Sequence, residues 1–319
     1  MGQNDELENF KTDINLTHYA ATQGYQLNTK KSSRTSVVMS NGSSDKVVIA
    51  ISEHDKHWIY FSVGNSNDSG SIIDFVQNRK SLNLGGVRQE LRPWTKGKIP
   101  SIEVSRYVAK LKPSSNDRAN VVALFEAMQP ITNHQYLEQV RQIPASILQN
   151  PRFSGKLYSD QHANAIFPHY DHDGLCGYEI RNNDFKGFAV GGTKGLWFSA
   201  VNRGDKRLVV TEGGIKALSY HILHPDKQTR FMSSAGRLNN IQPDLIKSAI
   251  SRLPDDGELI IATDADKGGR ELADQIKTLA TEAHRSISVR VHQPATMGFD
   301  WNDELIKKLS AKQSPQSHR

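Results

Sequence analysis

The chain is poor in cysteine and has no long hydrophobic run. A single cysteine, Cys176, among 319 residues excludes an internal disulfide framework and argues against a zinc site built on thiolates. No apolar stretch approaches the ~18 residues that a membrane-spanning helix needs, so we expect no membrane partner. The first residues are polar and acidic, unlike a secretory signal, and we therefore expect a cytoplasmic protein.

Acidic residues are scarce in one part of the chain. The formal net charge is +6, and residues 78–118 contain ten Lys or Arg against three acids. Trp94 and Tyr107 lie within this basic stretch, a combination that suits a nucleic-acid backbone and unstacked bases. A solvated basic linker is the alternative. The candidate nucleic-acid contacts in this stretch are Arg88, Arg92, Lys96 and Lys98.

Hydrophobic patterning predicts a small β-rich region first. Residues 14–27 read as a short helix that Asn15 or Thr17 caps. Three runs rich in β-branched residues and one amphipathic run predict a β-meander closed by a helix, at 36–40, 45–52, 57–63 and 71–80. Pro, Gly and Ser then bracket a linker at 95–117. Two helices and several short strands are expected after it, at 118–128, 133–143 and within 156–201.

From residue 207 onward, predicted strands alternate with predicted helices. The strands are expected at 207–212, 229–234, 258–266 and 286–294, and the helices at 214–223, 243–253, 268–284 and 300–310. Alternation of this kind predicts an α/β fold with a parallel sheet.

Acidic residues follow three of these predicted strands. Glu212 ends one strand, and Asp264 and Asp266 end another. Asp300 and Asp303 come shortly after a third. Because the carboxyl ends of parallel strands share one edge of a sheet, the carboxylates are expected to converge, and they repel one another unless a cation holds them. Hard oxygen ligands select Mg²⁺ or Mn²⁺, which clamp phosphate oxygens in nucleotidyl transfer. The alternative is that these acids cap the helices that follow them.

The sequence around these acids carries a family resemblance. The segments LVVTEGGIKALSY, LIIATDADKGGRELADQI and MGFDWNDEL resemble a toprim domain, the metal-binding fold of bacterial-type primases, topoisomerases and some nucleases. Upstream, FSVGNSNDSGSIIDFVQNR resembles the tail of a primase zinc ribbon. GGVRQELRPW and NAIFPHYDHDGLCGYEIR are similar to primase-like toprim proteins of plasmids and other mobile elements. The resemblance extends over about residues 14–309.

The resemblance implies a fold and a domain order. The fold is α/β, with a toprim-type parallel sheet flanked by helices and preceded by a small zinc-ribbon-like, β-rich N-terminal domain. Ser62 and Asn65 stand where the ribbon needs a Cys pair, so no zinc is expected. The implied parts are a degenerate ribbon (1–95), a basic linker (96–118), a helical and β-rich start of the catalytic domain (119–205), a toprim core (206–310) and a disordered tail (311–319).

The resemblance also implies roles for individual residues. Glu212, Asp264 and Asp266 correspond to catalytic, metal-binding acids, and Asp300 and Asp303 to further metal ligands. Family members usually carry an Asp four residues after the Glu, whereas this chain has Lys216, which either weakens a metal site or supplies positive charge to a phosphate. The basic residues implied to bind nucleic acid or nucleotide are Arg181, Lys194, Arg203, Lys216, Lys267 and Arg270.

The implied activity is that of a primase-like nucleotidyltransferase. It synthesises oligonucleotide primers on single-stranded DNA from nucleoside triphosphates by Mg²⁺-dependent phosphoryl transfer, for the replication or transfer of a mobile element, with a helicase or relaxase as a candidate partner. Two alternatives remain open: a metal-dependent toprim DNA nuclease, and a catalytically silent DNA-binding accessory module. Lys216 and the missing zinc ligands favour the silent module, and the retained acids favour an enzyme.

Overall fold

The computed structural model describes residues 3–42, 45–52, 56–63, 68–95, 116–183, 185–283 and 286–313. The chain divides into two compact units, residues 1–115 and 116–319. Within the described part of the chain, no helix combines the length and hydrophobicity that crossing a membrane requires.

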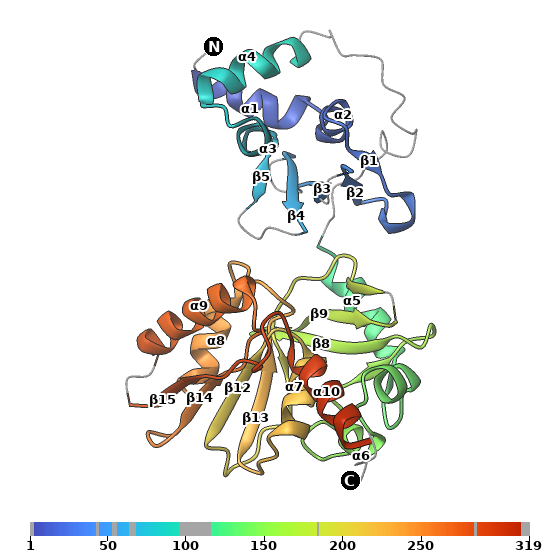
Figure 1. Ribbon diagram of the computed structural model, residues 1–319, viewed down its shortest axis with the longest axis vertical. Coiled ribbons are helices and arrows are strands. Elements are labelled where there is room, and N and C mark those ends of the chain that lie inside the picture. Colours follow the sequence, from blue (N-terminus) through green and yellow to red (C-terminus); the bar gives the residue numbers. More distant parts are fainter. Residues whose placement is uncertain are drawn as a thin grey trace, which may run out of the picture. The chain divides into compact units, whose positions relative to one another are not determined.

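The first unit is built on a five-stranded antiparallel sheet whose strands lie in sequence order (Figure 1). Its strands are β1 (Gln26–Leu27), β2 (Ser36–Ser40), β3 (Lys46–Ile51), β4 (Trp58–Ser62) and β5 (Ser69–Ser71). Its helices are α1 (Gln3–Asp13), α2 (Leu16–Thr22), α3 (Ile72–Lys80) and α4 (Leu84–Thr95). Phe75 of α3 is fully buried against the rings of Tyr19, Tyr25 and Tyr60. The predicted β-meander and its closing helix are therefore confirmed.

The helices of this unit are predicted only in part. Asn15 caps α2 as expected, because its Oδ1 accepts from the backbone N–H groups of Thr17 and His18 at 3.0 and 3.3 Å. The helix is shorter than predicted and ends at Thr22. Helices α1 and α4 were not expected from the sequence. They contact each other and α3, so tertiary packing stabilises them more than local patterning does.

The second unit contains an antiparallel sheet and a mostly parallel one. The antiparallel sheet has the order β10-β9-β8-β7-β6. Its strands are β6 (Gln129–Pro130), β7 (Tyr158–Ser159), β8 (Ala165–Asp171), β9 (Gly174–Arg181) and β10 (Lys186–Phe188). The same region contains the helices α5 (Arg118–Glu126) and α6 (Ala145–Leu148). The helix predicted at 133–143 is reduced to a π-helical turn, Tyr136–Val140, because Gln142 adopts a left-handed φ of 56° that ends the helical run.

The second sheet has the order β11-β13-β12-β14-β15. β12 pairs in parallel with β13 and β14, and β14 with β15, while the short edge strand β11 is antiparallel to β13. The strands are β11 (Trp197–Phe198), β12 (Arg207–Thr211), β13 (Thr229–Ser233), β14 (Glu258–Ile261) and β15 (Ser288–Val291). The helices are α7 (Gly214–Leu223), α8 (Gln242–Ile250), α9 (Lys267–Ala283) and α10 (Trp301–Gln313). The predicted alternation of strands and helices, and the parallel sheet, are confirmed.

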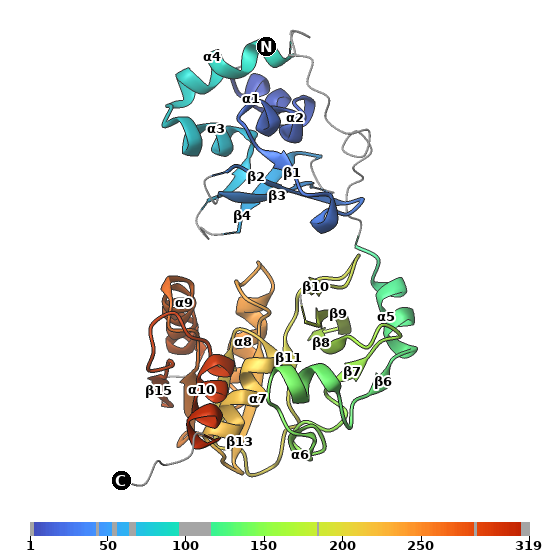
Figure 2. The same cartoon turned by 45° about the vertical axis from the view of Figure 1, so that its right-hand side comes forward.

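Helices cover both faces of this sheet. Val209 and Ile260 point into a core shared with α7 and α10, whereas Leu208 and Leu259 point into a core shared with α8 and α9. This division follows from the period of two along a strand, which sends successive side chains to opposite faces. Helices α7 and α10 lie side by side on their face (Figure 2). Glu212 and the loops after β13 and β14 lie at the carboxyl ends of the central strands.

Candidate functional site

The carboxyl ends of β12 and β14 bring two acidic side chains together. Glu212 follows β12 directly, and Asp264 lies three residues after β14. The Asp264 backbone N–H donates to Glu212 Oε1 at 3.1 Å, which joins the two loops. The loop after β13 closes on the same edge, because the Gly236 N–H donates to the Glu212 carbonyl at 2.7 Å.

Lys216 of α7 lies among the acids at this edge. Its Nζ is 3.7 Å from Glu212 Oε2 and 3.9 Å from Asp300 Oδ2. It also donates a hydrogen bond to Asp264 Oδ2. The side chains of Lys216 and Asp264 are each only 14% exposed. Because side chains on a helix lean toward its N-terminus, Lys216 reaches back toward the strand ends. We call Glu212, Asp264, Asp300 and Lys216 the carboxylate–lysine centre.

The charges of this centre act on one another. Burial lowers the pKa of Lys216, but Glu212, Asp264 and Asp300 outweigh burial and raise it, so the ammonium keeps its proton. Burial raises the pKa of Asp264 to about 7, with Glu212 and Asp300 adding to the effect and Lys216 opposing it. One ammonium does not balance three carboxylates, and the centre therefore keeps negative charge when all three are ionised.

The remaining predicted acids cap helices. Asp266 Oδ1 accepts from the Gly269 N–H at 2.7 Å and so caps α9. Asp303 Oδ2 accepts from the Asp300 N–H at 3.0 Å, and Asp300 Oδ1 accepts from the Asp303 N–H at 2.9 Å, which forms a reciprocal capping box on α10. The capping alternative therefore describes Asp266 and Asp303. Asp300 caps its helix with one oxygen and turns the other toward Lys216.

The centre contains hard oxygen ligands of the kind that bind Mg²⁺ or Mn²⁺. However, the Lys216 ammonium lies within 4 Å of oxygens from all three acids. Across the described residues, no group of three or more His, Cys, Asp or Glu side chains is arranged to hold a metal ion. In this arrangement the centre does not fit a divalent cation in addition to the ammonium.

A group of basic side chains borders the centre. Arg181 ends β9 and lies directly opposite Lys186 of β10 in the antiparallel register, a pairing of like charges that is unfavourable without an anion. Arg181 Nε donates at 2.8 Å to Glu179 Oε1, whose residue is 2% exposed. Lys194 Nζ donates to the Arg237 carbonyl at 2.9 Å. We call Arg181, Lys186, Lys194 and Arg237 the basic cluster.

The basic cluster has an excess of positive charge. Lys186 is exposed at its surface, but partial desolvation by its surroundings lowers its pKa, and Arg181 lowers it further. Burial likewise lowers the pKa of Lys194, with a further contribution from Lys186. Because Arg181, Lys186 and Lys194 share a single buried carboxylate, Glu179, an anion such as a phosphate would be stabilised here.

Gly213 connects the basic cluster to the carboxylate–lysine centre. A Cβ atom at this position would lie 3.5 Å from Arg181 Nη2 and 3.8 Å from Glu179 Oε2. The basic cluster therefore begins one residue from Glu212. Gly213 is also the N-cap of α7, where no side chain caps the helix, so its first N–H groups can receive a phosphate oxygen.

Three other predicted basic residues come from segments that do not contribute to this cluster. Lys267 and Arg270 are in the first turn of α9, where Lys267 is 72% exposed and 3.7 Å from Glu271. Arg203 lies in the turn before the amino end of β12, at the opposite end of that strand from Glu212. Arg203 is therefore not at the carboxyl edge, and its contact with nucleic acid or nucleotide stays a prediction. Arg203 precedes β12 by only a few residues, and so it must lie near the amino end of that strand.

The Lys and Arg side chains in the described part of residues 78–118 form ion pairs with Asp and Glu side chains. Arg88 and Arg92 of α4 contact Glu6 of α1 at 3.4 and 2.7 Å. Lys96 and Lys98 lie outside the described residues. The described residues thus present less uncompensated positive charge than the composition of 78–118 suggests. The other ion pairs are Arg79 with Asp45 and Asp68, Lys80 with Glu90, and Arg118 with Asp171 and Asp173.

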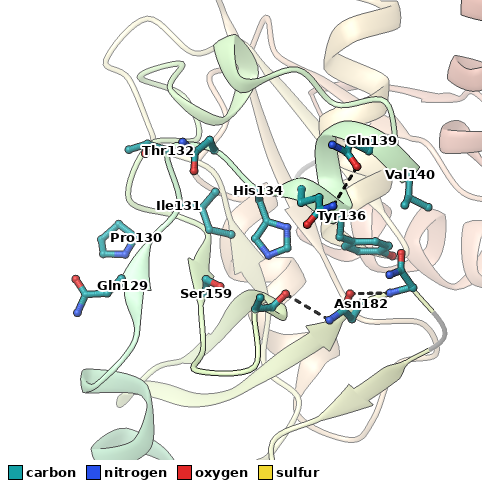
Figure 3. Close-up of a pocket in the computed structure, with 14 residues that line it drawn as sticks. Gln129, Pro130, Ile131, Thr132, His134, Tyr136, Gln139, Val140, Ser159 and Asn182 are labelled. Atoms are coloured by element: carbon teal, nitrogen blue, oxygen red, sulfur yellow. Dashed lines mark hydrogen bonds between the residues drawn. The ribbon is translucent and has the colours of Figure 1, made fainter.

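A cavity of about 680 Å³ lies elsewhere in the second unit (Figure 3). It is lined by residues 129–136, 139, 140, 159, 163, 182 and 183, which include no Asp, Glu, Lys or Arg. Burial lowers the pKa of His134, whose ring faces this cavity, so its neutral form is favoured. A cavity without charged side chains does not suit a phosphate chain, and the carboxyl edge is the better candidate for phosphate chemistry.

Sequence reasoning missed Glu179, Lys186 and Arg237. A signal existed for the first of them, because Glu179 and Arg181 are two residues apart on a predicted strand and so share one face. A glutamate inside the apolar run LCGYEIR also needs a buried partner. Lys186 and Arg237 carried no such signal, since only the strand register and the loop after β13 bring them to this edge.

Two family models match parts of the chain. One, described as Toprim-like, matches residues 209–305, which contain the carboxylate–lysine centre. The other, described as Protein of unknown function (DUF3991), matches residues 135–206, which contain Arg181, Lys186 and Lys194. No match was found among curated proteins.

Several solved structures are loosely similar. The primase fragment of the bacteriophage T7 primase-helicase protein is 17% identical, with a TM-score of 0.39, over 66% of this chain and 84% of that one. The Aquifex aeolicus primase, comprising zinc-binding and RNA polymerase domains, is 14% identical, with a TM-score of 0.32, over 96% and 83%. The RNA polymerase domain of Mycobacterium tuberculosis primase is 17% identical, with a TM-score of 0.30, over 50% and 58%. Similarity at this level does not indicate a shared function.

Proposed function

We propose that this protein, a toprim-domain protein by its match over residues 209–305, is a primase-like nucleotidyltransferase that acts on single-stranded DNA. One observation carries the proposal: the carboxylate–lysine centre and the basic cluster meet at one edge of the parallel sheet, joined at Gly213. The triphosphate of a nucleotide is strongly negative, so it needs basic side chains to bind. During transfer, negative charge shifts toward the leaving pyrophosphate, and polar groups near the reacting phosphate must accommodate this shift.

The residues of the chain have separate tasks in this proposal. Arg181, Lys186 and the first turn of α7 hold the phosphates of the incoming nucleotide, and Lys186, which is exposed, also contacts the DNA backbone. The Lys216 ammonium then offsets negative charge at the phosphate that a 3′-hydroxyl attacks. As the new O–P bond forms and pyrophosphate leaves, the hydroxyl proton passes to a carboxylate of the centre. Because the centre does not fit a resident divalent cation, we place Mg²⁺ in the substrate, as the magnesium complex of the nucleotide. No covalent bond to the protein is needed.

A catalytically silent DNA-binding module is the second candidate. The position of Lys216 favours it, since an ammonium that pairs with all three acids neutralises part of the centre. The nuclease alternative uses the same acids, and no contact in the structure favours it over nucleotidyl transfer. A role in a mobile element and a helicase or relaxase partner stay predictions.

A gel assay separates these functions. The full chain is incubated with a labelled single-stranded template, ribonucleotides or deoxyribonucleotides, and Mg²⁺. New oligonucleotides support the proposal, shortened template indicates a nuclease, and a mobility shift without product indicates the silent module. Asp264→Ala should abolish new product and retain the shift. New product from Asp264→Ala at the wild-type rate would show that the site is wrongly assigned.

The basic cluster is tested by the salt dependence of DNA binding. Lys186→Glu should weaken binding and reduce the slope of log affinity against log salt by about 1 or more, as expected for the loss of a phosphate contact. Lys277→Glu is the matched control, because Lys277 is a half-exposed lysine on α9 that pairs with Asp274. If the two variants have the same slope of log affinity against log salt, Lys186 does not contact DNA.

A further inference from the structure

The acids of the carboxylate–lysine centre present a set of three oxygens to one ammonium. Glu212 Oε1 accepts a hydrogen bond from the Asp264 N–H at 3.1 Å. Asp300 Oδ1 accepts from the Asn302 and Asp303 N–H groups at 2.8 and 2.9 Å. Their second oxygens, together with Asp264 Oδ2, are the ones that face Lys216 Nζ. One N–H of the ammonium is hydrogen-bonded to Asp264 Oδ2, while the oxygens of Glu212 and Asp300 lie at ion-pair distances of 3.7 and 3.9 Å, in reach of its two other donors after a small shift.

We propose that the Lys216 ammonium is the resident cation of this centre, in the position where a divalent metal ion would otherwise bind. The folded protein then has no Mg²⁺ or Mn²⁺ site of its own at this edge. The inference rests on the proposed function, because that function assigns the carboxylate edge to nucleotide phosphates.

The surroundings of Lys216 keep the ammonium in place. Ile215 and Ala217, its neighbours on α7, are buried in the core beneath the sheet, so the helix cannot turn Lys216 away from the strand ends. A divalent ion on the same three oxygens would lie next to the ammonium in a poorly solvated site, where like charges repel strongly. The ammonium and a resident metal ion therefore exclude each other.

This exclusion has a consequence for the ligand. A cation that arrives already bound to the phosphates of a nucleotide does not need the three acids as its ligands. The edge should therefore recognise a metal–nucleoside triphosphate complex, with the basic cluster on its phosphates, and not the free metal ion.

Binding of Mn²⁺ tests the inference directly, without any measurement of activity. Mn²⁺ is titrated into the full-length wild type, Lys216→Asp, Asp264→Asn and the control Lys277→Asp, and the free ion is followed by electron paramagnetic resonance. We expect no stoichiometric site in the wild type or in Lys277→Asp. We expect one site in Lys216→Asp that binds roughly tenfold or more tightly than any wild-type site. The melting temperature of Lys216→Asp should rise with added Mg²⁺, while that of the wild type should not.

One stoichiometric Mn²⁺ site in the wild type, lost in Asp264→Asn, would overturn the inference. This comparison decides the matter even if Lys216→Asp does not fold. The outcome is independent of the primer assay. A wild type that binds Mn²⁺ and makes primers refutes the lysine inference alone, and one that neither binds Mn²⁺ nor makes primers refutes the proposed function alone.

Discussion

Gly269 offers a sharp test of how the loop after β14 positions Asp264. Gly269 is buried in the first turn of α9, and a Cβ atom there would lie 2.1 Å from the Asp264 carbonyl oxygen and 2.8 Å from the Asp264 nitrogen. Both atoms belong to the backbone, so a rotamer change cannot relieve the contact. Gly269→Ala must therefore displace the segment that carries Asp264.

The size of the effect follows from this overlap. Ordinary contacts of a Cβ atom begin near 3.4 Å, so the loop must move by more than an ångström. Overpacking of this kind costs about 1–3 kcal/mol of unfolding free energy. A displacement of about 1 Å at a reacting centre lowers a catalysed rate roughly 100-fold. We expect both effects in Gly269→Ala.

Gly268→Ala is the matched control, one residue away. Gly268 is exposed, and a Cβ atom there would meet only Asp266 Oδ1, at 3.5 Å, which is an ordinary contact. Its unfolding free energy in urea, followed by tryptophan fluorescence, should stay within about 0.5 kcal/mol of the wild type. If Gly269→Ala matches Gly268→Ala in unfolding free energy and in primer synthesis, the loop does not position Asp264 as the geometry indicates.

Three further outcomes are expected. The side chains of Arg152 and Asp205 form a bidentate ion pair at 2.7 Å and are 5% and 2% exposed, so Arg152→Met should cost about 3–5 kcal/mol in urea unfolding. Arg152→Met with Asp205→Leu should recover only part of this cost, because the Ala200 and Lys227 carbonyls and the Asn202 N–H also lose their partners. Burial raises the pKa of Cys176 to about 12, so a thiol reagent at mildly alkaline pH should label the native chain far more slowly than the unfolded one; equal rates would contradict its burial. Burial lowers the pKa of His169, so the folded state binds a proton less readily than the unfolded state does. The unfolding free energy should therefore fall as pH drops below about 6.5, and less so in His169→Asn.

The elements of the second unit could be predicted because their signals are local. The runs RLVVT and ELII are short, apolar and β-branched, and each is followed by an amphipathic segment, so their alternation indicated a parallel sheet. The short helices of the first unit were harder. Helix α1 is mostly polar, and only its packing against α3 and α4, with Phe10 buried, shows why it forms.

The acids at the strand ends were visible in the sequence, but their roles were not. Asp264 and Asp266 are two residues apart, and no local rule says which one caps α9 and which one faces the centre. Glu212 and Lys216 are four residues apart, on either side of the start of α7, so the sequence indicates that this pair is close. That spacing does not reveal that Asp264 and Asp300 also surround the ammonium. These encounters join residues 48 and 84 positions from Lys216 along the chain.

The order of the strands and the paths of their loops decided which charges meet. Hydrogen bonding and side-chain periodicity within an element depend on residues a few positions apart, and an amino-acid sequence displays them directly. The contact of Lys216 with three acids, and the opposition of Arg181 and Lys186, depend instead on which strands are neighbours and in what register. Neighbours and register are set by packing both faces of the sheet at once, so they exist only in the folded chain.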